Sequence, residues 1–243
     1  MARLEIVPVP ALSDNYVWLL RDEATGTVAV VDPGEDGPVE AALAARGWEP
    51  ALILLTHHHG DHVGGVAALK AAHGAAVIGA AADAHRLPAL DRAVSPGDTV
   101  AVGESEAVVI DTPGHTRGHI AYHFPEAGVL ACGDTLFSLG CGRMFEGSAE
   151  EFFAALTRLA ALPDDTLVLC GHEYTQSNAR FALTVEPDNA ALRARAAEVE
   201  AQRAAGRPTV PVTLGAEKAA NPFLHARDAA AFAALRAAKD SFR

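Results

Sequence analysis

The sequence predicts a mixed α/β domain over residues 1–173, followed by a small helical domain over residues 174–243. Three observations lead to this fold class. Short apolar runs of strand type alternate with helical patterns through the first two-thirds of the chain. No strand pattern is expected after about residue 174. With 243 residues, half of them hydrophobic, the chain can bury the core of one large or two unequal domains.

The first domain alternates strands and helices in order. A helix over residues 37–47 ends at Gly47, and a second helix over residues 61–74 ends at Gly74, as left-handed glycines at helix ends allow. A third helix, residues 148–162, begins with Ser148 and has Glu151 three positions later, which predicts a capping box. Strands are expected over residues 4–10, 16–20, 27–32, 51–56, 75–80, 99–102, 106–111, 120–124, 128–134 and 166–173.

The second domain contains helical patterns separated by one irregular stretch. This stretch, residues 207–223, contains three prolines. The helices are expected over residues 176–185, 188–206 and 226–240.

Composition excludes several classes of protein. No run reaches the roughly 18 apolar residues of a membrane span, and the N-terminus lacks the apolar stretch of a signal peptide. The net charge of −12 disfavours nucleic acid and anionic membranes as partners. The odd number of cysteines and the lack of a C-x-x-C pair indicate reduced thiols in a cytoplasmic protein; they are Cys132, Cys141 and Cys170.

The stretch LTHHHGDHVGG, residues 55–65, places four histidines and one aspartate within six positions. We expect His57 and His59 to extend the preceding strand and to face the same side, because alternate side chains of an extended chain point the same way. His58 then points away and is not included among the candidate ligands.

The rest of this stretch turns into a helix. Asp61 and His62 begin that helix, where the loop can direct them back toward the first two histidines. Gly64 and Gly65 keep the turn free of side-chain bulk. The spacing differs from H-E-x-x-H, in which two histidines lie four apart on one helix face.

Three more candidate ligands, His115, Asp134 and His172, each follow an apolar strand and a glycine. They are therefore expected at the rim of a sheet, where active sites of layered α/β folds collect. The full set of five histidines and two aspartates suits zinc, iron or manganese rather than copper(I). Seven ligands are too many for one tetrahedral ion but suit two ions that share a carboxylate. An exposed histidine tract or unrelated buried histidines are the alternatives, and the agreement of four segments argues against both.

Several motifs resemble known families. THHHGDH, GHTRGH, CGDTLF and GHEYT resemble the metallo-β-lactamase superfamily, which implies an αββα sandwich and a two-metal site. SDNYVWLL, VDPG, CGRMFEG, PTVPVTLGAEKAANPF and RAAKDSF resemble, in this order, motifs of the glyoxalase II (hydroxyacylglutathione hydrolase) family. The resemblance covers essentially the whole chain. It implies a catalytic metal-binding first domain and a substrate-binding helical second domain.

The resemblance also implies the ligands and the reaction. One metal ion would bind His57, His59 and His115, the other would bind Asp61, His62 and His172, and Asp134 would bridge them. The ions would be divalent, with zinc the first expectation and iron or manganese also suitable. A hydroxide held between them would attack the thioester of S-lactoylglutathione, giving glutathione and D-lactate in methylglyoxal detoxification. Asp61 and Asp134 are the expected catalytic carboxylates.

An anionic substrate on an acidic protein needs local cations. By the same resemblance, glutathione would be held by Arg143, Phe145, Tyr174, Arg236 and Lys239. Arg143 stands where the family commonly has lysine, and Phe145 where tyrosine is common, so one hydroxyl contact is lost. Arg236 and Lys239 are three apart, on one helix face.

The sequence is also compatible with other interpretations. Asp32 either orients a metal-binding histidine or forms an Asp-Pro-Gly turn, and Asp14 and Asn15 are expected to cap a turn. His119 is expected to form a hydrogen bond nearby without touching metal. The alternative activities are hydrolysis of another ester, a lactone or a β-lactam, and a persulfide dioxygenase with one iron. Thioester binding without turnover is a further possibility. We expect a monomer.

Overall fold

The structure is a computed structural model, and it describes residues 3–242. The chain forms two compact units. The first unit is Met1–Asp111 with Gly118–Gly133, and the second is Thr112–Arg117 with Asp134–Arg243. No helix among residues 3–242 is long and apolar enough to cross a membrane.

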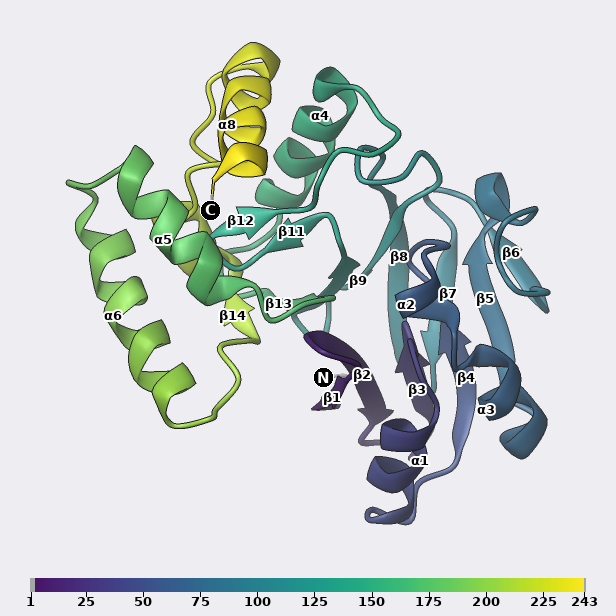
Figure 1. The fold of residues 1–243 in the computed structure, drawn as a ribbon. Helices are drawn as coiled ribbons and strands as arrows, with labels where there is room; N and C mark the ends of the chain where they lie inside the picture. Colours follow the sequence, from purple (N-terminus) through teal and green to yellow (C-terminus); the bar gives the residue numbers. More distant parts are fainter. Residues whose placement is uncertain (1–2, 243) are drawn as a thin grey trace. The chain divides into compact units, whose positions relative to one another are not determined.

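The first unit contains a mixed six-stranded sheet, in which strands β1 to β6 lie in sequence order (Figure 1). The first three strands are antiparallel, and β3 to β6 are parallel. Parallel neighbours need crossover connections, and helices α1 (Gly37–Ala44) and α3 (Val66–His73) supply two of them. The strands are β1 Leu4–Ala11, β2 Asn15–Asp22, β3 Val28–Val31, β4 Pro50–Leu54, β5 Ala76–Ala80 and β6 Arg92–Val94.

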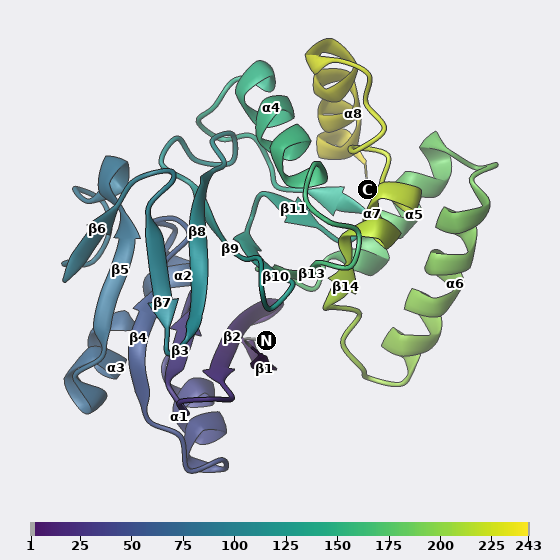
Figure 2. The same ribbon diagram turned by 180° about the vertical axis from the view of Figure 1, so that it is seen from behind.

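A second sheet of the same unit packs on the first (Figure 2). Its antiparallel strands are β7 Thr99–Val102, β8 Ser105–Asp111, β9 Ile120–Phe124 and β10 Val129–Gly133. The buried Tyr122 hydroxyl of β9 donates to the carbonyls of Leu55 and Ile78, at 3.1 and 3.3 Å. Because a buried hydroxyl needs a hydrogen-bond partner, this contact fixes one sheet against the other. Short helices α2 (Gly60–Val63) and η1 (Ala81–Asp83) complete the unit.

The second unit is mainly helical. Its strands form two small pairs, the hairpin of β11 (Leu136–Phe137) with β12 (Gly140–Cys141) and the pair of β13 (Leu167–Cys170) with β14 (Val212–Thr213). Its helices are α4 Ala149–Ala160, α5 Thr175–Val185, α6 Ala190–Ala204, α7 Leu214–Ala220 and α8 Ala229–Ser241. Helices α5, α6 and α7 share an apolar core of buried alanines and leucines.

The structure corrects the expected helix over residues 61–74. It is split into α2 and α3. A Cβ on Gly64 would lie 2.4 Å from the Gly34 carbonyl oxygen, and one on Gly65 would lie 2.6 Å from the Glu35 carbonyl carbon. The two glycines therefore let this turn press against the backbone after β3, and the helix breaks there.

Three further expectations were wrong. Strands do not stop at residue 174, because β14 pairs with β13; prolines 208 and 211 favour extended backbone just before it. The stretch after β14, which was expected to be irregular, forms helix α7. The Thr213 hydroxyl caps the start of this helix by accepting a hydrogen bond from Ala216 N. The expected extension of β4 to residue 59 was also wrong, since β4 ends at Leu54 and residues 55–59 form a loop.

Candidate metal centre

Both units contain side chains suited to metal binding. In the first unit they follow β4 and begin α2, which is short because it starts at Gly60 and ends before the two packed glycines. The ring centroids of His57 and His59 lie 4.7 Å apart, and those of His57 and His62 lie 4.1 Å apart. The loop therefore gathers these rings although it is not a strand.

Asp32 orients the buried histidines of this group. Its carboxylate accepts from Thr56 N at 2.8 Å and from Thr56 Oγ1 at 2.6 Å. Thr56 Oγ1 in turn lies 3.1 Å from His57 Nδ1, and Asp32 Oδ2 lies 3.2 Å from His62 Nδ1. Since the threonine hydroxyl already donates to Asp32, it can only accept from His57, and the carboxylate can only accept from His62.

These contacts fix the tautomers of both rings. With Nδ1 protonated, His57 and His62 each carry a lone pair on Nε2, the nitrogen that can bind a metal. His62 Nε2 faces Asp61 Oδ2 at 3.5 Å. Two acceptors facing each other are a favourable arrangement only with a cation between them or with an extra proton. The chemistry of these donors therefore fits a metal ion.

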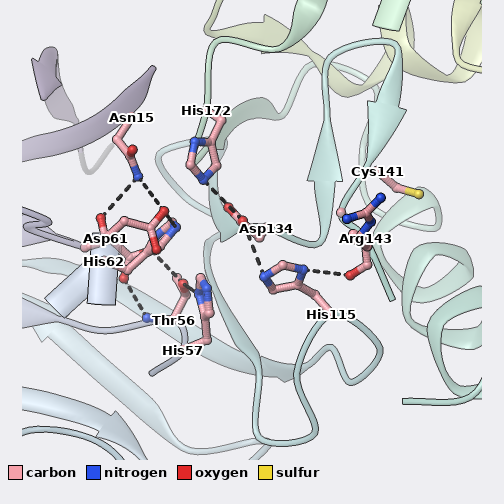
Figure 3. A network of polar contacts seen from close by, with 12 residues as sticks. Asn15, Thr56, His57, Asp61, His62, His115, Asp134, Cys141, Arg143 and His172 are labelled. Atoms are coloured by element: carbon pink, nitrogen blue, oxygen red, sulfur yellow. Dashed lines mark hydrogen bonds and ion pairs between the residues drawn. The ribbon is translucent and has the colours of Figure 1, made fainter. Parts of the chain in front are cut away.

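Asn15 holds Asp61 in place. Its side-chain amide donates to the Asp61 carbonyl at 3.1 Å and to Asp61 Oδ2 at 3.0 Å (Figure 3). Asn15 is the first residue of β2, so the sheet supports the aspartate. This contact spans 46 residues of sequence. The expected turn-capping role of Asn15 overlooked it.

The group of the second unit centres on Asp134. Its Oδ2 lies 3.4 Å from His115 Nε2 and 3.3 Å from His172 Nε2, and all three residues are buried (Figure 3). His115 Nδ1 lies 2.8 Å from the carbonyl oxygen of Arg143. Because a carbonyl only accepts, Nδ1 carries the proton and the Nε2 lone pair points at the carboxylate. This donor arrangement again fits a cation held by a carboxylate and neutral imidazoles.

The five predicted substrate residues lie in the second unit. Arg143 and Phe145 follow the β11–β12 hairpin; Phe145 is 59% exposed, and its ring centroid lies 5.3 Å from that of His115. Tyr174 stacks on the His172 ring with 4.6 Å between centroids. These two exposed aromatic rings therefore flank the metal-type donors of their own unit.

Arg236 and Lys239 share helix α8 but differ in exposure. Arg236 is 6% exposed, and its guanidinium donates to the Cys141 carbonyl at 2.8 Å and to Asp240 Oδ1 at 2.9 Å. Lys239 Nζ lies 3.0 Å from Ser177 Oγ. Partial burial, together with the charge of Arg236, lowers the pKa of Lys239. Arg236 thus supports the hairpin, while Lys239 is the better placed of the two to meet solute.

His58, His119 and the three cysteines are not among the candidate ligands. His58 Nδ1 pairs with Asp83 at 3.2 Å, as expected for a ring that points away. His119 stacks on His57, with 4.7 Å between the ring centroids. All three cysteines are buried and form no disulfide. Burial raises the pKa of Cys141 to about 11 and of Cys170 to about 12, so neither is a ready nucleophile.

Two family models match the chain in succession. The model of the metallo-beta-lactamase superfamily covers residues 12–172, and that of the hydroxyacylglutathione hydrolase C-terminus covers residues 173–242.

Curated relatives span nearly the whole chain. It is 60% identical over 229 residues to the hydroxyacylglutathione hydrolase of Rhodospirillum rubrum, covering 94% of this chain and 90% of that protein. It is 52% identical to the protein of the same name from Methylococcus capsulatus, covering 99% of each chain.

Among solved structures, ETHE1 from Myxococcus xanthus is 27% identical with a TM-score of 0.71, covering 96% of this chain and 89% of that one. TTHA1623 in a di-iron-bound form is 27% identical with a TM-score of 0.65, covering 90% and 100%. The predicted sandwich with a C-terminal helical region is thereby confirmed.

Proposed function

Because the chain belongs to the hydroxyacylglutathione hydrolase family of the metallo-β-lactamase superfamily, we propose that it hydrolyses S-(2-hydroxyacyl)glutathione to glutathione and a 2-hydroxy acid. S-Lactoylglutathione, which yields D-lactate, is the proposed substrate, and methylglyoxal detoxification the proposed role. The observation that carries this proposal is the match of residues 173–242 to the C-terminal region of these hydrolases. The superfamily match alone does not indicate which thiol carries the acyl group of the substrate.

We assign the metal ligands by the family resemblance and by donor chemistry. His57, His59 and His115 would hold one divalent ion, Asp61, His62 and His172 the other, and Asp134 would join both. When bound, two such ions would lower the pKa of water and polarise the substrate carbonyl. Zinc is the proposed metal, and iron or manganese also suit these donors.

The protein's own residues orient and balance this site. Asp32 keeps Nδ1 of His62 protonated, and Thr56 does the same for His57. The Arg143 carbonyl keeps Nδ1 of His115 protonated. Asp134 supplies negative charge to offset two cations. In the overall reaction a water oxygen bonds to the acyl carbon, the carbon–sulfur bond breaks, and the sulfur leaves as thiolate. Asp61, whose side chain is 41% exposed, can accept a proton from water at its carboxylate.

The glutathione moiety would bind along the second unit. Its carboxylates complement Arg143 and Lys239, and Tyr174 and Phe145 offer exposed rings for the peptide. Arg236, which is buried against the hairpin, would act on glutathione through a change in its present contacts or through its charge alone. We propose a cytoplasmic monomer.

One experiment separates the activities. Metal content of the purified protein is measured alongside cleavage of S-lactoylglutathione and of the matching thioester that lacks the glutathionyl peptide. Two ions per chain with strong preference for the glutathione thioester support the proposal. One iron per chain with oxygen consumption on a persulfide, or equal cleavage of a lactone, would contradict it.

A further inference from the structure

We propose that Glu217 and Asn221 of helix α7 are positioning residues for Asp134, acting through the tip of the β11–β12 hairpin. This hairpin joins the proposed bridging ligand, Asp134, to the proposed glutathione contact, Arg143. The inference rests on the proposed function for its catalytic consequence, but its geometry lies wholly within the second unit. It gives a role to the stretch TLGAEKAANPF, which has none in the chemistry above.

Glu217 forms hydrogen bonds to the turn of the hairpin. It is fully buried, its Oε1 accepts from Ser138 Oγ at 2.7 Å, and its Oε2 accepts from Leu139 N at 2.8 Å. Asn221 Nδ2 donates to the same Oε2 at 3.0 Å. Every partner donates, so these contacts match a carboxylate. The separation of 78 or 79 residues makes this a tertiary clamp.

Asn221 holds the same turn from its carbonyl side. Its amide donates to the carbonyls of Phe137 at 3.1 Å and Gly140 at 2.9 Å, the two residues that flank the turn. From helix α5, Asn178 Nδ2 donates to the Ser138 carbonyl at 3.1 Å. A Cβ on Gly140 would lie 2.5 Å from that amide nitrogen. The polar groups of the turn are thus satisfied by side chains of the C-terminal helices.

Apolar burial also holds the turn and maintains an uncommon backbone conformation in it. Leu139 has a φ of 57°, which is uncommon for a residue with a side chain, and it is fully buried in the core shared with α5, α6 and α7. Such backbone persists only where surrounding contacts determine it, and Glu217 binds its amide. The tip of the hairpin is therefore part of the helical core.

The base of the hairpin connects the tip to Asp134 and packs against His115. Gly142 N donates to the Thr135 carbonyl at 3.3 Å, which continues the pairing to the residue next to Asp134. A Cβ on Gly142 would lie 1.9 Å from the Asp134 carbonyl oxygen and 3.1 Å from His115 Nδ1. With the chain packed this closely, a shift of the tip moves Asp134 relative to His115 and His172.

The test compares three variants. Glu217→Met removes the acceptors at similar volume. Glu217→Gln keeps the three contacts with one acceptor fewer, because its oxygen can accept from Leu139 N and Asn221 while its amide donates to Ser138 Oγ. Lys218→Met, on the same helix, removes only bonds to the Leu162 carbonyl and Asp164 and is the matched control.

We expect Glu217→Met to lose part of its bound metal, to alter the visible spectrum of the cobalt-substituted protein, and to lower kcat about tenfold or more. KM for S-lactoylglutathione should change by less than about threefold, because an altered transition-state interaction appears in kcat. Glu217→Gln and Lys218→Met should match the wild type in metal content and cobalt spectrum. Should Glu217→Met fail to fold, Ser138→Ala, which removes one partner without adding bulk, is expected to show a smaller change of the same kind.

Two outcomes would overturn the inference. One is a Glu217→Met or Ser138→Ala protein that is less stable but has wild-type metal content, cobalt spectrum and kcat; Glu217 then only stabilises the fold. The other is Glu217→Gln failing as badly as Glu217→Met. If the wild type does not cleave the thioester, the proposed function fails, while metal content and the cobalt spectrum still decide whether Glu217 positions Asp134.

Discussion

Single hydrogen bonds decide which nitrogen of each buried histidine is available. Asp32 has a φ of 52°, and this left-handed backbone turns its carboxylate toward both Thr56 and His62. The sequence is compatible with either an Asp-Pro-Gly turn or an orienting carboxylate, and in the structure the carboxylate contacts both Thr56 and His62. Its role depends on contacts 24 and 30 residues away, which local sequence does not encode.

Asp32→Asn tests this orientation. Asparagine tolerates the left-handed backbone, but its amide nitrogen facing His62 Nδ1 would force the proton onto Nε2. We expect metal affinity, measured by competition with a chelator, to fall about 10- to 100-fold with little change in the unfolding midpoint. Asp83→Asn, which alters the similar pair with His58, is the control and should leave metal affinity unchanged. Equal effects of the two variants would contradict the orienting role.

Asp134→Ala tests the shared carboxylate. Its Oδ2 faces the Nε2 atoms of His115 and His172, and on the proposed assignment its loss would leave two cations without the negative charge they share. We expect the variant to fold, to bind about one metal ion in place of two, and to lose nearly all thioesterase activity. Far-ultraviolet circular dichroism checks the fold and elemental analysis the metal. Near-normal turnover with two ions would exclude the bridging assignment.

Among the secondary-structure elements, those with local signals were predicted well. The capping box of α4 is present, with Ser148 Oγ accepting from Glu151 N, and α3 ends at Gly74 with a φ of 66°. Helix α7 was missed although its Thr213 cap is a local signal, whereas β14 and the break before α3 were missed because they depend on distant partners. Strand β14 is extended because it pairs with β13, and Gly64 breaks a helix only because the Gly34 carbonyl lies against it.

His73 gives the first unit a pH-dependent contact between elements. Burial alone would lower the pKa of His73, but hydrogen bonds to Glu49 and Glu40, at 2.7 and 3.0 Å, outweigh it and raise that pKa. A pKa raised in the folded state stabilises it fully below the unfolded value of about 6.5, and the stabilisation disappears as pH rises through the folded pKa.

His73→Gln should therefore lower the free energy of unfolding mainly at acidic pH. The expected loss is about 0.5–1 kcal/mol at about pH 6 and much less at about pH 9, since Glu49 is 83% exposed and solvent screens the pair. Urea unfolding of both proteins at these pH values measures the difference. A loss that is constant with pH, or larger at alkaline pH, would rule out the charged contact.

At the level of the whole molecule, function follows from the order of motifs along the chain. The histidine stretch alone indicates a superfamily, while the C-terminal stretch, matched over residues 173–242, indicates the substrate. Composition predicted that the cations must be local, because the chain carries a net charge of −12. The sequence could not predict that Arg236 would be buried against the Cys141 carbonyl, because helix periodicity does not show which other segment covers a residue. The assignment of individual substrate residues stays a prediction.

The local cations should govern the salt dependence of substrate binding. Arg143 and Lys239 would contact a part of the substrate remote from the scissile carbonyl, and equal binding of ground and transition states affects KM rather than kcat. Their contacts are partly exposed: the Arg143 side chain is 55% exposed. A charged hydrogen bond contributes about 1.5–3 kcal/mol when buried. After screening, the Arg143→Ala, Lys239→Ala double variant should therefore raise KM about tenfold at low salt.

Added salt should raise the KM of the wild type. It should raise the KM of the double variant by less, because the charges that salt screens have been removed. Lys70→Ala, which removes one surface cation paired with Asp91, is the control and should keep the wild-type KM and salt response. Steady-state kinetics on S-lactoylglutathione at two ionic strengths provide the measurement, and a double variant that behaves like Lys70→Ala would show that these residues do not hold glutathione.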